Sequence, residues 1–518
     1  MLEKEKYRFM DISGLQKTEG IETRANKTYI LEQLKKRFPD VQLKKITVTL
    51  FDQGVYGKKS GLVNRLLGIE NHITGLPAFY EISLDISTGQ HEEELIVWSP
   101  LAWNDRFAGT AGGGIGIGGR NYITAPNNTQ RGWTVPFALM NGFTAATIDA
   151  ANTKGLKDFT IHKDGSLNRE LYENWCYRST HHMTVFGKAI AEILHERPVK
   201  YSYMNGGSGG GRQSLMEVQL YPDDYDGVWA SCPAINWNDF ILSAFWPYVV
   251  MKEKKCFIDA ETNQFFIDAV HSHYGGKEAY YHMQERPVFD AGTLVGTKGP
   301  HGIITETEAE VMNEIWRGPH TRDGAFLWYG YYPGVKNWQK VIPVGTYYYP
   351  FLRKNRIKAF ILAEYYAKWI TEDPSFQMED LDWDKLADLI NKGREKFSDN
   401  LGCDAKIDRF AEHGGKLMID HGMDDPLIPT EGTIHYYEKL RKYFDKDILD
   451  SFCRVFITPG DNHGNCWGNG AGITESDGLR YLINWVENEN VSDEIRKVRV
   501  DKKSGKTLEE GVQKAYGL

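Results

Sequence analysis

The chain has 518 residues, more than one compact core usually holds, so we expect two domains or one large domain with a big insertion. Its net charge of −9 includes no basic block, which argues against nucleic acid as a partner. No apolar stretch follows the N-terminal residues 1–6, and none of about 18 residues occurs elsewhere, so neither a secretory signal nor a membrane anchor is predicted. The six cysteines form no CxxC pair and fit a reduced, cytoplasmic setting; a secreted chain that had lost its signal peptide would look the same.

The first half of the chain alternates between strand and helix patterns. Alternating or continuous apolar runs predict strands at residues 46–50, 95–98, 142–148, 200–204 and 227–230. Amphipathic spacing predicts helices over 170–196 and 212–220. A strand–helix–strand order of this kind favours a mostly parallel sheet covered by helices.

The pattern changes after residue 235 and returns near residue 399. Residues 236–398 are rich in aromatic side chains, glycine and charge, with irregular helical signals, and we interpret them as an inserted lid domain. Strands are expected again at 416–420 and 454–457, and a helix at 478–487. The prediction is therefore a discontinuous catalytic domain, 1–235 and 399–518, interrupted by the lid, 236–398.

Residues 206–210 contain a serine between glycines. The spacing is G-x-S-x-G, with Ser208 at its centre, and it lies between the strand 200–204 and the helix 212–220. A strand, a tight glycine turn with a central serine and a helix make a nucleophile elbow. Glycine is needed in such a turn because a Cβ would collide with neighbouring elements. Ser208 is thus the candidate nucleophile; the alternative is a glycine-rich loop that merely contains a serine.

Two later loops supply a candidate acid and base. The strand 416–420 leads into a loop with Asp424 and Asp425, and the strand 454–457 leads into a glycine-rich loop with His463. A serine nucleophile needs a base, and the base needs an acid to orient it. In α/β-hydrolases these follow the serine in the order acid, then histidine, on loops after strands. The same order here predicts His463 as the general base.

The glycine-rich segment 109–119 admits two interpretations. A glycine in 112–114, with Gly113 and Gly114 the candidates, can supply one N–H of an oxyanion hole, and Gly209 can supply the other. Residues 114–119 also match G-x-G-x-x-G, the dinucleotide fingerprint, although we expect no helix after them and no strand immediately before them. A dinucleotide-dependent oxidoreductase using this loop is therefore the alternative from another class of enzyme.

At these residues the chain resembles the tannase/feruloyl esterase family. The elbow and the Y-P-D-D-Y-D-G run at 221–227 are similar to the family's G-C-S-x-G-G-R…YPxDFDG signature, and W-N-D-R-F at 103–107 is similar to its W-N-G-R-F entry. The resemblance covers roughly residues 45–500 and implies an α/β-hydrolase core, a lid over the site and hydrolysis of esters of aromatic acids. The matching H-G-x-x-D-P run at 421–426 selects Asp425 over Asp424 as the acid of the triad.

Two departures from the family pattern bear on disulfides and metals. In many members, cysteines at the positions of Gly207 and Gly464 form a disulfide that links the serine and histidine loops of the triad. We call this disulfide the clip, and none is expected here. The lid keeps Asp259 and Asp290 without the D-x-x-D-G spacing of the family's calcium loop, which argues against calcium. His271 and His273 could ligate a metal, but an H-x-H pair on a surface segment usually has no such role. We predict no metal and no cofactor.

The expected function is a serine carboxylic-ester hydrolase. Hydroxycinnamate esters such as ferulates are the first expected substrates and gallate esters the second, with Trp316, Trp328 and Tyr329 as candidates for the wall of the acyl pocket. A C–C hydrolase or acyltransferase on the same triad and a non-catalytic binding module are the rival interpretations. The expected partner is a small aromatic ester; the oligomeric state is not predicted.

Overall fold

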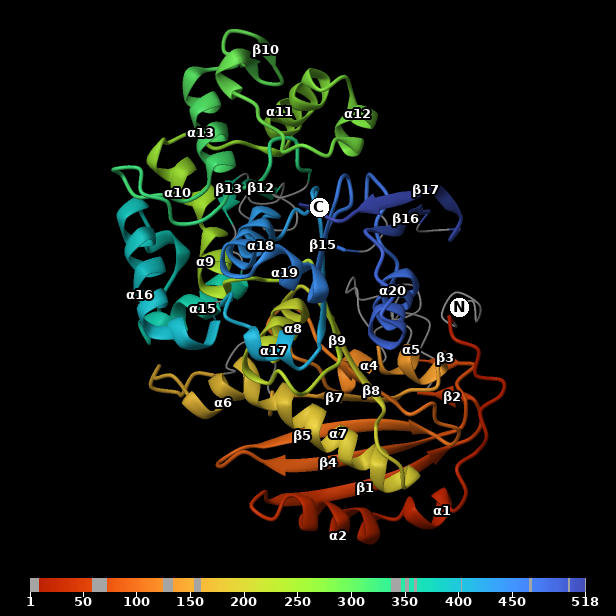
Figure 1. Ribbon diagram of the computed structural model, residues 1–518. Helices are drawn as coiled ribbons and strands as arrows, with labels where there is room; N and C mark the ends of the chain where they lie inside the picture. The colour runs from red at the N-terminus through yellow and green to blue at the C-terminus, as the bar shows by residue number, and fades with distance from the viewer. Residues whose placement is uncertain are drawn as a thin grey trace.

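The computed structural model describes residues 9–57, 72–123, 134–152, 160–336, 346–349, 354–357, 361–401, 403–464, 468–501 and 504–517. Its centre is a nine-stranded sheet with the order β1-β4-β5-β7-β6-β8-β9-β14-β15 (Figure 1). The strands are β1 (Leu43–Phe51), β4 (Phe79–Ser87), β5 (Glu92–Pro100), β6 (Arg106–Thr110), β7 (Thr144–Ile148), β8 (Tyr201–Gly207), β9 (Gly227–Ser231), β14 (Lys416–Gly422) and β15 (Cys453–Thr458).

The sheet has an antiparallel edge and a parallel remainder. β1, β4, β5 and β7 pair antiparallel in turn, whereas every pairing from β7 through β6, β8, β9 and β14 to β15 is parallel. Parallel neighbours need crossover segments, and helices supply them here. The predicted mostly parallel α/β sheet is confirmed. The strands expected at 227–230, 416–420 and 454–457 lie within β9, β14 and β15, and the one expected at 200–204 begins one residue before β8.

Both faces of the parallel strands are apolar, and successive residues enter different cores. Trp229 packs in one buried cluster, while its neighbours Val228 and Ala230 pack in the other. This alternation follows from the two-residue period of a strand, and burial on both faces is typical of parallel sheets. Helices α5 and α20 contribute side chains to the cluster of Trp229, and α7, α8 and α18 contribute to the other.

The helices of the predicted catalytic domain flank this sheet. They are α1 (Ile21–Arg24), α2 (Lys27–Arg37), α4 (Arg120–Ile123), α5 (Val135–Met140), α6 (Arg169–Glu173), α7 (Ser179–His195), α8 (Gly209–Leu220), α17 (Asp408–Glu412), α18 (Glu431–Tyr443), α19 (Lys446–Phe452) and α20 (Glu475–Asn488). Two small hairpins pair β2 (Val55–Tyr56) with β3 (Ile73–Thr74), and β16 (Glu494–Val500) with β17 (Thr507–Lys514).

The long helix expected over 170–196 contains a wide turn. α6 passes into one π-helical turn, Asn174–Arg178, before α7 begins. The guanidinium of Arg212 donates to the backbone oxygens of Trp175 and Cys176 at 3.0 and 2.9 Å and stacks on the Trp175 ring. A π turn changes the direction of carbonyl groups and is often found at functional sites. Here the turned carbonyls anchor the arginine of α8, the helix that follows Ser208.

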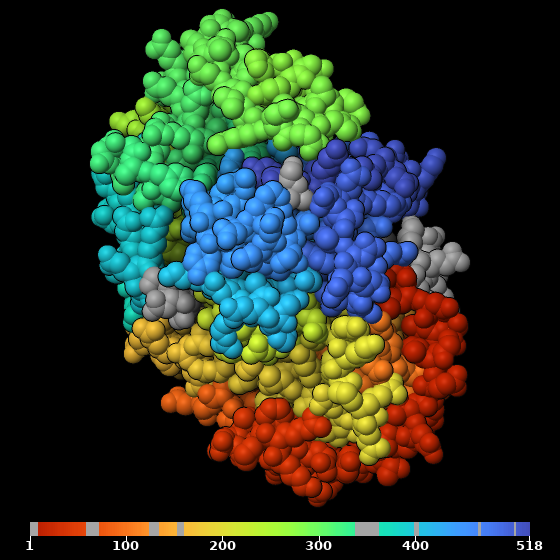
Figure 2. All heavy atoms as spheres, viewed as in Figure 1, coloured from red at the N-terminus to blue at the C-terminus, as the bar shows by residue number. Residues whose placement is uncertain are grey.

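The chain between β9 and β14 lies outside the central sheet. It contains α9 (Trp237–Ser243), α10 (Trp246–Glu253), α11 (Ala260–His273), α12 (Lys277–His282), η3 (Ala291–Leu294), α13 (Glu306–Arg317), α15 (Ile361–Thr371), η4 (Met378–Asp380) and α16 (Trp383–Leu401), with two short hairpins, β10 (Lys298–Gly299) with β11 (Gly302–Ile303) and β12 (Thr346–Tyr349) with β13 (Lys354–Ile357). Figure 1 shows α10 to α13 as a lobe at one end of the molecule, and in Figure 2 this green lobe lies against the blue C-terminal part. The boundaries 236–398 stay a prediction. None of the described helices is long and apolar enough to cross a membrane.

Candidate active site

Ser208 occupies a sharp turn between β8 and α8. Its backbone has φ 60° and ψ −123°, in a region that a side chain disfavours. The turn is held from both sides, because Ser208 N–H donates to the Ser231 oxygen at 3.0 Å and the Ser208 oxygen accepts from Ala234 N–H at 3.0 Å. β8 runs to Gly207 and α8 starts at Gly209, so the elbow is tighter than the sequence pattern indicates.

The glycines around Ser208 are required by contacts with neighbouring backbone. A Cβ on Gly206 would lie 2.4 Å from the Gly210 oxygen, and one on Gly210 would lie 2.5 Å from the Gly112 oxygen. Both distances are far below van der Waals contact. The G-x-S-x-G spacing therefore reflects close packing of the elbow against the loop after β6.

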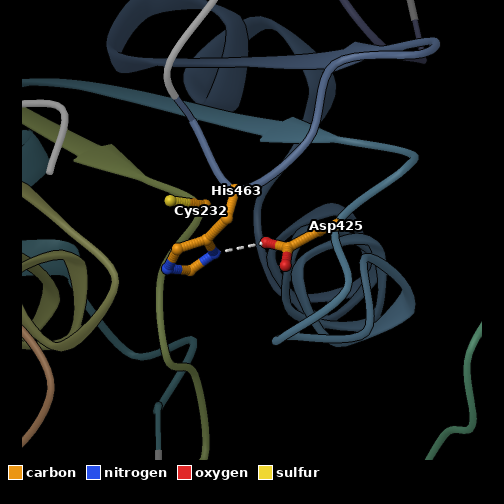
Figure 3. A group of neighbouring side chains, drawn as sticks. All are labelled: Cys232, Asp425 and His463. Carbon is orange, nitrogen blue, oxygen red and sulfur yellow. Dashed lines mark hydrogen bonds and ion pairs between the residues drawn. The ribbon is translucent and has the colours of Figure 1, made fainter. Parts of the chain in front are cut away.

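His463 and Asp425 meet where β15 and β14 end. His463 Nδ1 lies 2.7 Å from Asp425 Oδ2 (Figure 3). β8, β9, β14 and β15 are successive parallel strands, so their carboxyl ends reach the same edge of the sheet. The loops that carry Ser208, Asp425 and His463 therefore share the edge at which open α/β sheets bind ligands.

Asp425 is buried and accepts four hydrogen bonds. Its Oδ1 accepts from the backbone N–H groups of Leu427 and Ile428 at 2.7 and 3.0 Å, and its Oδ2 faces His463 and also His421 Nε2 at 3.0 Å. Burial would raise the pKa of Asp425, but His463 and His421 outweigh it and hold that pKa well below its usual range. The carboxylate is therefore ionised and can orient and stabilise a protonated His463.

His421 is a second histidine on the same carboxylate, which sequence reasoning passed over. Its ring is fully buried, and its Nδ1 lies 2.8 Å from Thr433 Oγ1. Because both ring nitrogens have partners, His421 holds Asp425 in place without facing the reaction site. The four-residue spacing from His421 to Asp425 in H-G-x-x-D-P was the available signal.

Asp424 bonds to Asn469, whereas His463 bonds to Asp425. Asp424 Oδ2 accepts from Asn469 Nδ2 at 2.5 Å, and Asp424 borders a small cavity with Tyr280 and Met283 of the lid. Burial raises the pKa of Asp424 to about 8. The two neighbouring acids thus have opposite electrostatic environments, and the histidine contact belongs to Asp425.

Cys232 lies beside His463, and no sequence motif drew attention to it. One ring nitrogen of His463, one carboxylate oxygen of Asp425 and Cys232 Sγ lie within 4.8 Å of one another (Figure 3). Cys232 follows β9 directly and has a positive φ of 34°. Burial would lower the pKa of His463, but Asp425 and Cys232 raise it, and the net result lies well above the usual value. The position of Cys232 directly after β9, the strand that pairs with β8, was the one signal that could have identified it.

The loop after β6 lies against the residue that follows the nucleophile. A Cβ on Gly209 would lie 2.2 Å from the Gly114 oxygen. Gly112 N–H already donates to the Ile117 oxygen at 2.6 Å, whereas the N–H groups of Gly113, Gly114 and Gly209 have no acceptor among the described residues. Backbone N–H groups left open beside a nucleophile are what an oxyanion hole requires.

The flanks of the G-x-G-x-x-G run differ from those expected. β6 ends at Thr110, four residues before Gly114, and α4 begins at Arg120, so the prediction that no helix follows was wrong. α4 has four residues and starts after the motif. The loop folds back on itself and onto the elbow, and it does not open a helix as a dinucleotide loop does.

The predicted lid aromatics lie at different places. Trp316 packs against Phe266 and Phe289 inside the lid. Trp328 and Tyr329 lie over α18, where Tyr329 Oη is 2.8 Å from His435 Nδ1. Among the described residues, the hydrogen bonds and ring contacts of these three side chains do not include a triad residue. A different lid side chain contacts the loop that carries Asp425: Tyr331 Oη donates to the Leu427 oxygen at 3.5 Å. Burial and the Asp425 charge raise the pKa of Tyr331.

Three of the four candidate metal ligands of the lid have hydrogen-bond partners within the protein, and the fourth, His273, packs against the rings of Tyr274 and Phe289. Asp259 caps α11 and lies 2.7 Å from His301, and Asp290 accepts from Asn313 at 2.7 Å. His271 faces the Gly334 oxygen at 3.1 Å. Within the described part of the chain, the groups of three or more ligand-type side chains are Cys232–Asp425–His463 and His181–Glu217–Asp224.

Comparison with known proteins points to one family. The family described as "Tannase and feruloyl esterase" matches residues 90–514. A probable feruloyl esterase of Arthroderma benhamiae is 30% identical over 413 residues, which are 76% of this chain and 73% of the relative. Feruloyl esterase B from Aspergillus oryzae has a similar structure, with a TM-score of 0.74, 20% identity and coverage of 96% of both chains. Tannin acyl hydrolase from Aspergillus niger has a TM-score of 0.77, 18% identity and coverage of 98% and 94%. The two structures support the fold alone, whereas the family match and the relative establish that the chain belongs to the tannase and feruloyl esterase family.

Proposed function

We propose that this protein is a serine carboxylic-ester hydrolase acting on esters of aromatic acids, with hydroxycinnamates such as ferulates as the first substrate class. The observation that carries the proposal is the His463–Asp425 hydrogen bond at the sheet edge where the Ser208 elbow projects. The relatives named feruloyl esterase favour hydroxycinnamates. The family description, which includes tannases, makes gallate esters the second candidate.

The proposed reaction has two steps that share one base. Ser208 Oγ attacks the ester carbonyl while its proton passes to His463, and His463 then gives that proton to the departing alcohol. In the second step His463 takes a proton from water, the hydroxide attacks the acyl-enzyme, and the acid leaves as Ser208 regains its proton. Asp425 fixes the tautomer of His463 and stabilises its charged form.

Negative charge develops on the carbonyl oxygen in both steps. The N–H group of Gly209 and one from Gly113 or Gly114 would donate hydrogen bonds to that oxygen. The close approach of the Gly114 backbone to Gly209 supports this assignment. Loss of one such donor typically costs about 100- to 1,000-fold in kcat. The substrate's acyl group would extend toward the lid, where Tyr331 lies close to the triad.

The test is hydrolysis of matched methyl esters: ferulate, caffeate, gallate and butyrate. We expect the highest kcat/KM with ferulate or caffeate, and loss of several orders of magnitude in Ser208→Ala with its thermal midpoint retained. Preference for gallate would indicate that the protein is a tannase rather than a feruloyl esterase. Turnover of Ser208→Ala near the parent rate would refute the mechanism.

We propose separately that the protein works in a reducing compartment such as the cytoplasm. Cys176, Cys232, Cys256, Cys403 and Cys453 are free thiols, and glycines stand at positions 207 and 464 where many family members carry the clip. Fractionation of the source cells, with the protein followed by antibody, tests it; recovery outside the cells would contradict it.

A further inference from the structure

A second histidine–carboxylate cluster lies apart from Ser208, toward the far end of the elbow helix. We call it the α7–α8 cluster: His181 of α7, Glu217 of α8 and Asp224 of the loop after α8. One ligand-type atom from each of the three side chains lies within 4.8 Å of the others. His181 Nδ1 is 2.7 Å from Asp224 Oδ2, and the imidazole stacks on the Tyr221 ring with 3.9 Å between centroids. The imidazole is thus held with Nδ1 toward Asp224.

Glu217 is the unusual member of this cluster. It is 1% exposed, and neither of its carboxylate oxygens has a hydrogen-bond partner in the described part of the chain. Burial and the neighbouring Asp224 raise the pKa of Glu217 well above its ordinary value. An ionised carboxylate that is buried without a partner costs several kcal/mol. Glu217 therefore needs a positive partner, which is either a proton shared with Asp224 or a metal ion.

Lys188 does not fill that need. Its ammonium group donates to the backbone oxygen of Asp224 and lies 5.5 Å from the centroid of the Tyr225 ring. Burial lowers the pKa of Lys188 although Asp224 and Glu217 act to raise it. Its charge reduces the negative potential of the cluster, but it leaves both Glu217 oxygens without a donor.

The donor atoms indicate which ion would fit. Calcium and magnesium prefer oxygen ligands alone, whereas zinc accepts imidazole nitrogen with carboxylate oxygen at about 2.0–2.2 Å. Donors already within 4.8 Å of one another can converge on one such ion by small side-chain rotations. We propose that His181, Glu217 and Asp224 bind one divalent transition-metal ion, with Zn²⁺ the best match.

Solvent can deliver the ion, and the ion would have a structural effect. The side chains of His181 and Asp224 are 31% and 12% exposed, so the site opens to the surface while Glu217 closes its inner side. A bound ion would join α7, α8 and the loop into β9. Because α8 starts immediately after Ser208, the ion would hold the elbow helix in place without contacting substrate.

The test is zinc stoichiometry and thermal stability in the intact protein. The protein is stripped with chelator, loaded with Zn²⁺ at pH 7, gel-filtered and analysed by elemental mass spectrometry. We expect one zinc per chain and a higher thermal midpoint after loading. Glu217→Gln and His181→Asn should each bind Zn²⁺ at least about tenfold more weakly. The fold of each variant is compared with that of the stripped parent by circular dichroism. If one variant does not fold, the zinc affinity of the other variant tests the proposal.

Two controls separate this site from other histidine clusters. His182→Asn changes the next residue of α7, whose ring bonds the buried Glu93, and it should retain the zinc. Cys232→Ala removes the thiol of the other three-residue group and should also retain it. Zinc lost with Cys232→Ala but kept in Glu217→Gln would overturn the proposal. So would a parent that binds no zinc, which would assign the shared proton to Glu217.

Discussion

The active site and the α7–α8 cluster both join a histidine to buried carboxyl groups. The pKa of the carboxyl group is lowered at Asp425 in the first and raised at Glu217 in the second. His463 and His421 lower the pKa of Asp425 despite complete burial, through their charge and their hydrogen bonds. Burial and the neighbouring Asp224 carboxyl group raise the pKa of Glu217, whose oxygens have no donor among the described residues. Burial is common to both, so the charge of the neighbouring side chains decides whether a carboxyl group is ionised.

Asp425 therefore remains charged in the folded protein, whereas Glu217 needs a proton or a cation beside it. Asp425 can stabilise an imidazolium that appears and disappears during turnover, because its own charge is fixed by four hydrogen bonds. Glu217 can hold a proton or a metal ion, and its occupancy depends on pH and on metal supply.

The largest effect is expected from removing the charge of Asp425. Asp425→Asn should reduce kcat by about 10⁴-fold, because an amide favours the wrong tautomer of His463 and cannot stabilise its protonated form. Glu217→Gln should leave kcat within a few-fold of the parent, because Glu217 does not contact the triad. Steady-state kinetics on the best ester measures both. Similar losses in the two variants would end the distinction between the clusters.

A smaller effect is expected at Asp424, the acid adjacent to the triad acid. The folded pKa of Asp424 is about 8, above the unfolded value of about 3.9, so the folded state holds the extra proton and loses stability as pH rises between these values. Asp424→Asn removes that dependence. The thermal midpoint of the parent should therefore fall relative to the variant between pH 5 and pH 8. Activity of the variant should stay far above that of Asp425→Asn; the reverse order would reassign the acid.

Local spacing in the sequence supplied the candidates for the site. Ser208 was proposed because a strand, a glycine turn and a helix are consecutive, and His463 because it follows an apolar run. An apolar run also precedes Asp424 and Asp425, and the family resemblance selected Asp425 between them. His421 was missed although its partner Asp425 is only four residues further along the chain. Cys232 was missed, since its role depends on which strands become neighbours. Lid contacts such as Tyr331 were missed for a related reason: their partners are more than 90 residues away in the chain.

The helices of the lid were also harder to predict, for a physical reason. Helix α10 has six consecutive buried residues, from Trp246 to Met251, because other helices cover several of its sides. A helix buried around most of its circumference lacks the polar stripe that produces an amphipathic period. Its sequence therefore looked irregular although the helix itself is regular.

A smaller effect than that of Asp424→Asn is expected on the pKa of His463, the general base. Cys232 acts with Asp425 to raise the pKa of His463. The base must be neutral to accept the Ser208 proton, so kcat/KM rises as pH increases through the pKa of His463 in the free enzyme. Cys232→Ala removes one of the raising contributions, and the acid limb of the pH profile should move to lower pH. A limb that stays in place or moves to higher pH would show that the thiol does not influence His463.

The smallest effect on turnover is expected from reductant and chelator. Glycines at positions 207 and 464 exclude a disulfide between them, and the five described cysteines are free thiols, so dithiothreitol should leave ester hydrolysis unchanged. No proposed step uses a metal as Lewis acid, so EDTA should also leave kcat nearly unchanged. If the α7–α8 cluster holds zinc, EDTA should lower the thermal midpoint of the parent but not that of Glu217→Gln. Rates after each incubation, with the midpoints measured in parallel, test this. Complete inactivation by EDTA that calcium reverses would reveal a lid calcium site, and inactivation by dithiothreitol would require a disulfide that supports the triad.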